Sequence, residues 1–151
     1  MNVRIDRSTG EFILDGEKLG GTLEEPEFLR SALGSSAKKI QSSRSRTYYE
    51  IWQQVDPELE IGIIVRFQPG GGLDRITAKF VKAGMRSTPW SKEMEEDLKG
   101  FHDRWLREQL GSPPWQFAWG KAISAFEPHW YSASIVIDYA RPSQHFKTVE
   151  Q

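Results

Sequence analysis

The sequence lacks cysteine altogether and has almost no excess of either charge. Without cysteine the chain cannot form disulfides, use a thiolate as a nucleophile or bind zinc through sulfur, and such a composition fits a reducing compartment. Lysine and arginine total 20 against 21 aspartates and glutamates, which gives a formal net charge of -1. A nearly neutral chain has no overall field that attracts polyanions, so we expect neither nucleic acid nor a membrane as partner.

Long hydrophobic runs are also missing. No segment approaches the ~20 consecutive apolar residues that span a bilayer. The charged start, from Met1 to Arg7, lacks the apolar segment of a signal peptide. We therefore expect a cytoplasmic protein.

Motifs that carry catalysis or bind metals are absent as well. Residues 69–72 (Pro-Gly-Gly-Gly) come nearest to a phosphate-binding loop, but they lack the Lys-Ser/Thr ending and lead into a strand, so we interpret them as a hairpin turn. The histidines at 102, 129 and 145 are too far apart for a local metal motif. The sequence accordingly predicts no catalytic residue, no cofactor and no metal.

What the sequence does contain is one clear helix, from Trp90 to Gly111. Ser91 can cap its first turn, Gly111 can end it, and its acidic and basic residues follow the direction of the helix dipole. At about 100° per residue, the apolar stripe is predicted to comprise Met94, Leu98, Phe101 and Trp105, flanked by Leu106 and Leu110. The acidic run is interpreted as an exposed face and comprises Glu93, Glu95, Glu96 and Asp97.

Most of the other segments read as strands. Residues 47–55, 61–67 and 76–80 alternate apolar and polar side chains, and the turns between them are too short for parallel crossovers, which indicates an antiparallel meander. Residues 3–5 and 11–16 predict an N-terminal hairpin. Two further strands are expected after the long helix, at 115–126 and 131–139.

The predicted fold class is α+β, with a single antiparallel sheet of about five to seven strands and one long and one short helix packed on one face. The short helix is expected from Leu23 to Leu33, and the Ser-rich, basic stretch from Ser35 to Arg46 is expected to be a solvated loop. The buried side of the short helix should comprise Phe28, Leu29, Ala32 and Leu33. We expect one domain, residues 1–140, and a flexible C-terminal tail, residues 141–151.

Two polar residues, His102 and Gln109, lie on the apolar side of the predicted long helix. We predict that both cap backbone groups or ordered water at the edge of the core, because buried polar atoms must find partners. A general base is the alternative for His102. The neighbouring Asp103 diverges from it by about 100° around the helix, however, and is wrongly placed to orient it.

Five stretches of the chain carry a resemblance to known proteins. They are Phe12–Gly16, Trp90–Ser91, His102–Gly111, Trp119–Gly120 and Ser134–Tyr139. With these stretches the chain resembles a group of small, mostly uncharacterised bacterial proteins, some of which are similar to immunity proteins of polymorphic toxin systems. The sequence departs from the family pattern at Lys121, Glu127 and Asp138, where acidic, aspartate and basic residues respectively are expected.

The resemblance implies a non-enzymatic, cytoplasmic protein that binds one cognate toxin domain and blocks its active site or its access to substrate. Such binding needs a rigid sheet and aromatic anchors rimmed by charge. The expected partner-binding residues near the last hairpin are Trp115, His129, Trp130 and Tyr131, although Trp130 folding back on the core is an equal alternative. A second, basic group, which would face an acidic toxin surface, comprises Lys38, Lys39, Arg44 and Arg46.

Two alternatives of other classes stay open. One is a small-molecule-binding or hydrolase-like domain with a pocket between the long helix and the sheet, where His102 works with a tyrosine such as Tyr49 or Tyr139; it predicts a hydrated cavity beside His102 and a perturbed histidine pKa. The other is a structural module that forms a homodimer through an open sheet edge.

Overall fold

The computed structural model describes residues 1–42, 45–68, 71–87, 89–129 and 132–140. The predicted site residues Arg44, Trp130 and Tyr131 and the predicted tail, residues 141–151, lie outside the described residues. The strands are β1 (Val3–Ile5), β2 (Phe12–Leu14), β3 (Glu17–Leu19), β4 (Lys38–Ser42), β5 (Thr47–Asp56), β6 (Leu59–Phe67), β7 (Leu73–Lys82), β8 (Trp115–Phe117), β9 (Gly120–Glu127) and β10 (Ser132–Tyr139). The helices are α1 (Glu25–Arg30), α2 (Ala32–Ser35) and α3 (Lys92–Leu110), and Met85–Ser87 forms a short 3-10 helix, η1.

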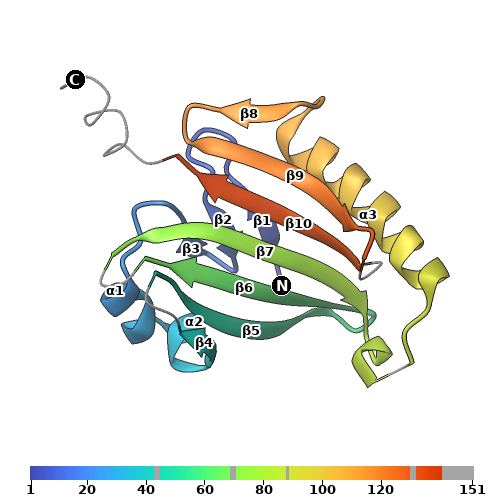
Figure 1. Ribbon diagram of the computed structural model, residues 1–151, viewed down its shortest axis with the longest axis horizontal. Helices are drawn as coiled ribbons and strands as arrows, with labels where there is room; N and C mark the ends of the chain where they lie inside the picture. Colours follow the sequence, from blue (N-terminus) through green and yellow to red (C-terminus); the bar gives the residue numbers. More distant parts are fainter. Residues whose placement is uncertain (43–44, 69–70, 88, 130–131, 141–151) are drawn as a thin grey trace.

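The fold is α+β, as predicted, and its main element is a seven-stranded antiparallel sheet in the order β4-β5-β6-β7-β10-β9-β8 (Figure 1). The predicted meander of β5, β6 and β7 is confirmed, with Ile63 facing Ile51 on one side and Ala78 on the other. The last strand, β10, pairs with β7 and connects the meander to the C-terminal hairpin. The predicted N-terminal hairpin of β1 and β2 is also confirmed, but it continues into β3 and forms a separate three-stranded sheet.

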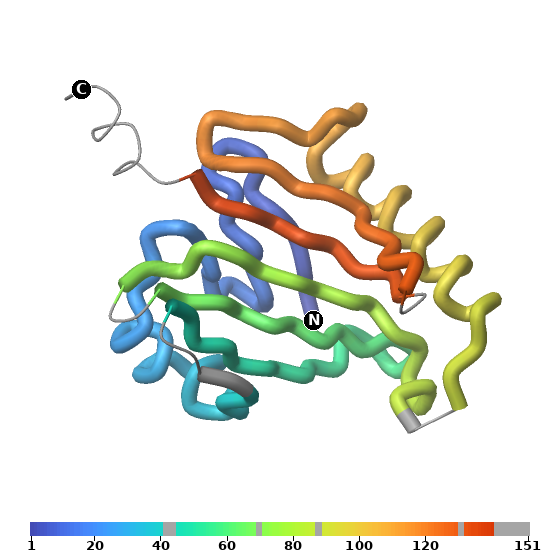
Figure 2. Tube along the Cα trace, viewed as in Figure 1, coloured from blue at the N-terminus to red at the C-terminus, as the bar shows by residue number. Residues whose placement is uncertain are grey.

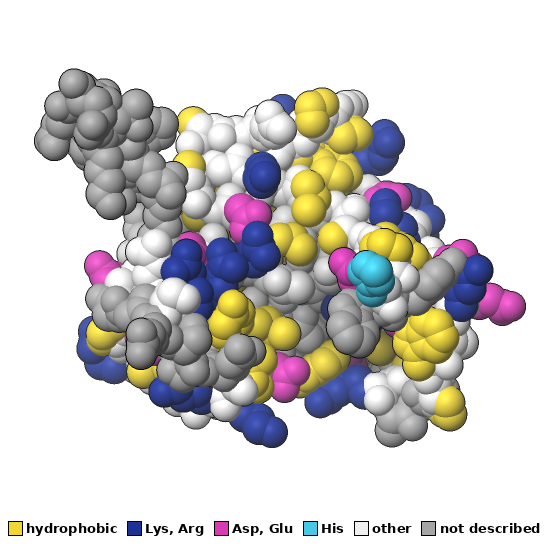
Figure 3. Space-filling model, viewed as in Figure 1, with side chains coloured by type: hydrophobic (Ala, Val, Ile, Leu, Met, Phe, Trp, Pro, Cys, Tyr) yellow, Lys and Arg dark blue, Asp and Glu magenta, His cyan; other side chains and the backbone are white. Residues whose placement is uncertain are grey.

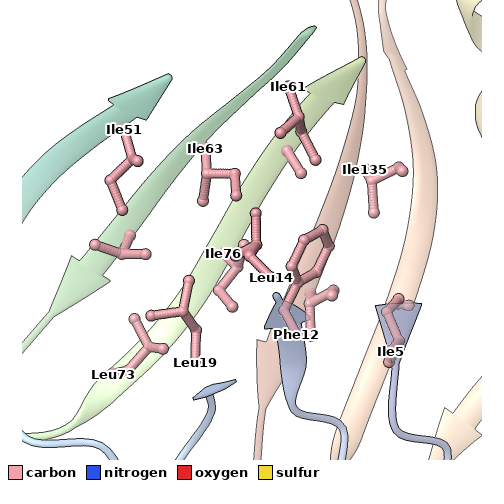
Figure 4. Packing of buried hydrophobic residues seen from close by; sticks show 14 of the residues in the cluster. Ile5, Phe12, Leu14, Leu19, Ile51, Ile61, Ile63, Leu73, Ile76 and Ile135 are labelled. Atoms are coloured by element: carbon pink, nitrogen blue, oxygen red, sulfur yellow. The ribbon is translucent and has the colours of Figure 1, made fainter. Parts of the chain in front are cut away.

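The core lies on one face of the large sheet, which we call the core face. Figure 4 shows Phe12, Leu14 and Leu19 of the small sheet opposite Ile63 and other aliphatic side chains of the large sheet. The small sheet, α1 and α3 all contribute side chains to this core. Figures 1 and 2 show the small sheet behind the large one. Strand β6 illustrates the alternation, because its fully buried residues are spaced by two: Ile61, Ile63, Val65 and Phe67.

Helix α3 forms where the sequence predicts it. The Ser91 hydroxyl accepts a hydrogen bond from the Met94 amide at 3.1 Å, and Gly111 ends the helix with φ 86°, a conformation that glycine adopts easily. The buried stripe is rotated from the predicted one. Its fully enclosed members are Glu95, Leu98, His102, Leu106 and Leu110, whereas Met94, Phe101 and Trp105 are only half-buried.

Glu95 explains the rotation and corrects the prediction that it lies on an exposed acidic face. Its side chain is 2% exposed and accepts hydrogen bonds from the Lys79 ammonium at 2.6 Å and the Ala133 amide at 2.9 Å. These donors lie beyond the last β7–β10 residue pair, Ala78 with Ile135, where the ladder between the two strands has ended. A carboxylate from α3 thus satisfies groups that the sheet leaves unpaired.

Three local predictions were wrong. The short helix breaks at Ser31 into α1 and α2, so that Phe28 and Leu33 are buried but Leu29 and Ala32 are exposed. The expected loop from Ser35 to Arg46 contains the edge strand β4, whose lysines suit an edge because charge there discourages pairing with other chains. The expected strand 115–126 is a hairpin of β8 and β9, with a turn at Ala118 and Trp119.

The turn of the β1–β2 hairpin joins the small sheet to the large one. Gly10 has φ 77°, and a Cβ atom there would lie 2.3 Å from the Trp119 ring. The Tyr139 hydroxyl donates to the Gly10 carbonyl at 2.7 Å, and the Trp119 indole N–H donates to the Arg7 carbonyl at 2.8 Å. Only glycine fits this position.

In the described part of the chain, none of the helices is long and apolar enough to cross a membrane.

Candidate protein-binding site

The second face of the large sheet is not covered by any described helix or strand. Figures 1 and 2 look onto this face. We call it the open face, and its side chains are those that alternate with the core residues: Tyr48, Glu50, Trp52, Ile64, Arg66, Arg75, Thr77, Lys79, Lys121, Ile123, Ala125, Ser134, Val136 and Asp138. A broad, uncovered sheet surface is the part of this molecule best suited to contact a protein.

A row of charged side chains crosses the open face from strand to strand. The strand register places Arg66 of β6 opposite Arg75 of β7, Arg75 opposite Asp138 of β10, and Asp138 opposite Lys121 of β9. Arg75 and Asp138 form a two-pronged ion pair, with distances of 2.6 Å from Nε to Oδ1 and 3.2 Å from Nη2 to Oδ2. In Figure 3 the Lys and Arg side chains gather over this part of the sheet.

One end of the row is held by a buried carboxylate. Asp74 is the extra residue of a β-bulge between β6 and β7, and its side chain is only 6% exposed. Its two oxygens lie 2.7 Å from the Nε atoms of Arg46 and Arg66. Burial lowers the pKa of Arg66, but the hydrogen bond and charge of Asp74 outweigh burial and raise that pKa above its ordinary value. Arg66 is therefore positively charged at every physiological pH.

We call this group the basic end of the open face. It comprises Arg46, Arg66, Asp74, Arg75, Lys121 and Asp138. The residues come from segments far apart in the sequence, and no local motif marks them. The only sequence signal is their position between apolar residues in alternating strands, which places them on the face opposite the core.

An apolar strip lies next to the basic end. Two residues further along each strand, a second row crosses the sheet from β6 to β9. It comprises Ile64, Thr77, Val136 and Ile123. Ile123 is 47% exposed, which makes it one of the most exposed large hydrophobic side chains among the described residues. The open face thus combines an apolar strip with a charged margin, as protein interfaces do.

The far end of the open face is closed by its own side chains and by Arg86 of η1. The Trp52 ring lies over Gly62, where an added Cβ would come within 2.6 Å of it, and the Arg86 guanidinium lies 3.8 Å above the same ring. Lys79 reaches down to the buried Glu95. The Trp52 ring is covered and the Lys79 charge is balanced by Glu95. The basic end has more bases than acids and the apolar strip exposes Ile123, so these two are the better candidates for contact with another molecule.

The predicted aromatic cluster is not assembled by the described residues. Trp115 is buried, and its indole N–H donates to the Gly111 carbonyl at 2.8 Å, so the ring belongs to the edge of the core and offers little surface to a partner. His129 is exposed in the β9–β10 turn. Trp130 and Tyr131 lie outside the described residues, and contact of this cluster with a partner stays a prediction.

The predicted basic group is divided between two places. Lys38 and Lys39 are exposed on the edge strand β4, whereas Arg46 joins the basic end through Asp74. Arg44 lies outside the described residues. The sequence therefore indicated Arg46 as a site residue, marked Lys121 and Asp138 only as departures from the family pattern, and gave no sign of Arg66 or Arg75.

Both predicted capping residues of α3 are confirmed. The Gln109 carbonyl oxygen accepts from the Ile5 amide at 3.0 Å, and His102 Nε2 accepts from the Phe80 amide at 3.1 Å. His102 is completely buried, and burial, followed by the charge of Lys79, lowers its pKa to about 4. Its Nδ1 atom has no hydrogen-bond partner among the described residues. The neutral ring is a structural acceptor that ties α3 to β7.

The geometry does not favour a pocket chemistry that uses His102. Its ring packs against Phe80 and Phe101, and no part of it is exposed. A groove of about 620 Å³ runs beside α3, but it is lined by residues such as Met85 and Met94 and not by His102. Within the described residues, no three histidine, aspartate or glutamate side chains are grouped in a way that could hold a metal ion.

The two tyrosines proposed to work with His102 are engaged elsewhere. The Tyr49 hydroxyl donates to Glu25 at 2.6 Å, and burial together with this partner raises the pKa of Tyr49 to about 12. The Tyr139 hydroxyl donates to the Gly10 carbonyl, and burial raises its pKa too. Both tyrosines therefore act as neutral donors that hold the fold together.

Two departures from the family pattern turn out to be neighbours. Lys121 and Asp138 face each other across the β9–β10 pair. Position 121 carries lysine where an acidic residue is expected, and position 138 carries aspartate where a basic residue is expected. The exchange keeps the two charges opposite, so it leaves the local balance unchanged and places both residues within the basic end.

Comparison with known proteins is informative about the fold. No protein-family model matches this chain, and no curated protein sequence matches it. A solved structure described as Rhs1-CT in complex with cognate immunity protein RhsI1 contains a chain of similar fold, with a TM-score of 0.62 and 18% sequence identity over 99% of this chain and 96% of that chain. At this identity the likeness shows a shared fold, and it agrees with the resemblance to immunity proteins that the sequence motifs indicate.

Proposed function

We propose that this protein is an immunity-type protein, which binds a cognate bacterial toxin domain and blocks it without catalysing a reaction. The observation that carries the proposal is the fold shared, over nearly the whole length of both chains, with a component of the Rhs1-CT and RhsI1 complex. The stretches that carry the sequence resemblance support it independently, because they are features of the sequence and not of the fold.

The two faces of the large sheet support a binding role. Blocking a toxin requires only that a stable surface occupy the active site or the path to it, and a preformed surface loses little freedom on binding. The core face is filled by the small sheet and the helices, which leaves the open face as the broad surface available for contact. We place the toxin on the open face and the protein in the cytoplasm.

The non-enzymatic part of the proposal rests on His102. Its side chain is fully buried and accepts a backbone hydrogen bond, so a substrate has no route to it. The alternative of a homodimer through a sheet edge is less well supported. Edge strand β4 carries Lys38 and Lys39, and lysine on an edge disfavours pairing with a second copy.

Co-purification tests the proposal most directly. If the gene upstream encodes a large secreted protein with a variable C-terminal domain, that domain should form a stoichiometric complex with this protein on size exclusion. Expression of the domain alone should arrest bacterial growth, and co-expression of this protein should restore it. A C-terminal domain from an unrelated toxin serves as the control. If the cognate domain forms no complex with this protein and growth is not restored, the proposal is ruled out.

A further inference from the structure

The basic end of the open face carries more positive charge than the described residues neutralise there. It contains four basic side chains, Arg46, Arg66, Arg75 and Lys121, but only two carboxylates, Asp74 and Asp138, so two positive charges are in excess. The nearest acid in the adjoining row, Glu50, faces Lys38 across the β4–β5 pair and does not offset the excess. The whole chain, by contrast, has a net charge of -1.

We infer that the basic end, together with the apolar strip beside it, binds an acidic surface of the protein partner. The inference rests on the proposed function and assigns the chemistry of the surface that the partner presents. Carboxylates of the partner would supply the negative charge that the basic end lacks. The apolar side chains of Ile64, Val136 and Ile123 would be covered at the same time.

The three arginines of the basic end are held in place before any partner arrives. Asp74, nearly buried, holds the Nε atoms of Arg46 and Arg66 at 2.7 Å, and Asp138 holds Arg75 through two hydrogen bonds. An arginine whose side chain is already fixed loses less conformational freedom on binding than a free one. Guanidinium groups also recognise carboxylates through paired hydrogen bonds, which adds geometric selectivity to the charge.

Other occupants fit this surface less well. A second copy in a twofold contact centred on the basic end would set positive charge against positive charge. A nucleic acid would leave the apolar strip facing phosphates, and the net charge of the chain does not favour a polyanion. An acidic protein surface is the occupant that matches both the charge and the apolar strip.

Charge reversal at two positions tests the inference. In Arg75→Glu with Lys121→Glu, neither side chain contacts the buried Asp74, so the bulge is preserved. Binding to the co-purifying toxin domain, measured by titration calorimetry, should weaken on the order of 100-fold, mainly through slower association, and the salt dependence of binding should decrease. Arg75→Met with Lys121→Met removes the charges without setting glutamate against Asp138, and it should weaken binding on the order of 10-fold.

The matched control is Arg4→Glu with Lys18→Glu. These residues are also one arginine and one lysine, and both are exposed on the small sheet, on either side of Ile13. The net charge change is the same, but we expect affinity to change by less than about threefold. Circular dichroism and thermal unfolding of all variants confirm that the fold is kept.

The remaining outcomes are decisive in different ways. If the wild type binds the toxin domain, and Arg75→Glu with Lys121→Glu binds it as well as the control Arg4→Glu with Lys18→Glu does, the inference is wrong and the proposed function stands. If the wild type does not bind the domain, both are wrong. If a DNA or RNA oligonucleotide competes with the toxin domain for binding, the basic end belongs to a nucleic acid and the inference is overturned. It is also overturned if sedimentation shows a dimer that Arg75→Glu with Lys121→Glu dissociates, because the basic end then binds a second copy.

Discussion

The two faces of the seven-stranded sheet are built from the same strands but carry different tasks. On β6, Ile63 points to the core face and is fully buried, whereas its neighbour Ile64 points to the open face and is only half-buried. The core face is covered by the small sheet, α1 and α3, while the open face bears the basic end and the apolar strip. Stability is therefore concentrated on one face, and the side chains of the other face contribute less to it.

Polar groups differ between the faces in the same way. On the core side, His102 and Glu95 are buried and accept hydrogen bonds from the amides of Phe80 and Ala133, which lie beyond the end of the β7–β10 ladder. On the open face, Arg75 and Asp138 are partly exposed, with 40% and 26% of their side chains accessible. Buried polar atoms are costly to leave without partners, but a solvated ion pair contributes little to stability.

The largest expected effect comes from truncating one face and then the other at adjacent positions. Ile63→Ala should lower the free energy of unfolding by about 4 kcal/mol, because it removes fully buried methyl groups and leaves a cavity. Ile64→Ala should lower it by about 1 kcal/mol, because part of that side chain is already in water. Urea unfolding measures both values. Equal losses at the two positions would contradict the division between a core face and an open face.

The second prediction concerns pH and the core side. In the folded state the pKa of His102 is about 4, below its ordinary value of 6.5, so the native protein binds fewer protons than the unfolded chain between these values. The contribution of the neutral His102 ring to the free energy of unfolding is present above pH 6.5 and is lost as the pH falls to about 4. The loss should reach about 3 kcal/mol, since protonation of Nε2 would oppose two donors, its own N–H and that of Phe80.

The control for this pH effect is His102→Gln, in which an amide oxygen can accept from Phe80 but cannot titrate. Urea unfolding of the wild type and the variant should be compared between pH 7 and pH 4. The wild type should lose more stability than the variant across this window. Parallel stability curves would mean that another group carries the acid sensitivity.

A third prediction separates packing from backbone strain where the small sheet joins the large one. Gly10 and Gly16 both have positive φ, but only Gly10 has the Trp119 ring in the path of a Cβ atom. Gly10→Ala should cost about 2 kcal/mol, from strain and displacement of the ring together, whereas Gly16→Ala should cost about 1 kcal/mol, from strain alone. Thermal unfolding of the two variants gives the comparison. A smaller effect at Gly10 would show that the hairpin turn is not anchored on Trp119.

The smallest effect is expected on the open face. Arg75→Met should change the free energy of unfolding by less than about 0.5 kcal/mol, because a partly exposed ion pair contributes little. Urea unfolding at low and high salt measures this contribution. A loss of several kcal/mol would mean that the open face is a structural element rather than a surface available for binding.

The regular elements were the most predictable part of the fold. Alternation predicted β5, β6, β7 and β10, and the caps Ser91 and Gly111 predicted both ends of α3. The same reasoning failed where the signal was weak. Strand β4 was mistaken for a loop because its serines and lysines suit either state, and only pairing with β5 makes it a strand.

The candidate site was much less predictable. The basic end takes residues from the segment just before β5, from β6 and β7, and from the C-terminal hairpin, and no spacing in the sequence indicates that they meet. The aromatic residues near the last hairpin gave a stronger signal, yet Trp115 is buried at the edge of the core. An aromatic side chain can be a binding anchor or a core residue, and composition does not distinguish the two.

The sequence by itself determined where the long helix and the strongly alternating strands of this protein lie. Its periodicity set which segments are strands or helix and which side chains share a face, because backbone geometry fixes those repeats within a few residues. Only the tertiary structure decided that β10 pairs with β7, that α3 turns Glu95 and His102 inward, and that Lys121 meets Asp138 in the basic end. Such meetings depend on burial and hydrogen bonding between distant segments, which local periodicity does not encode.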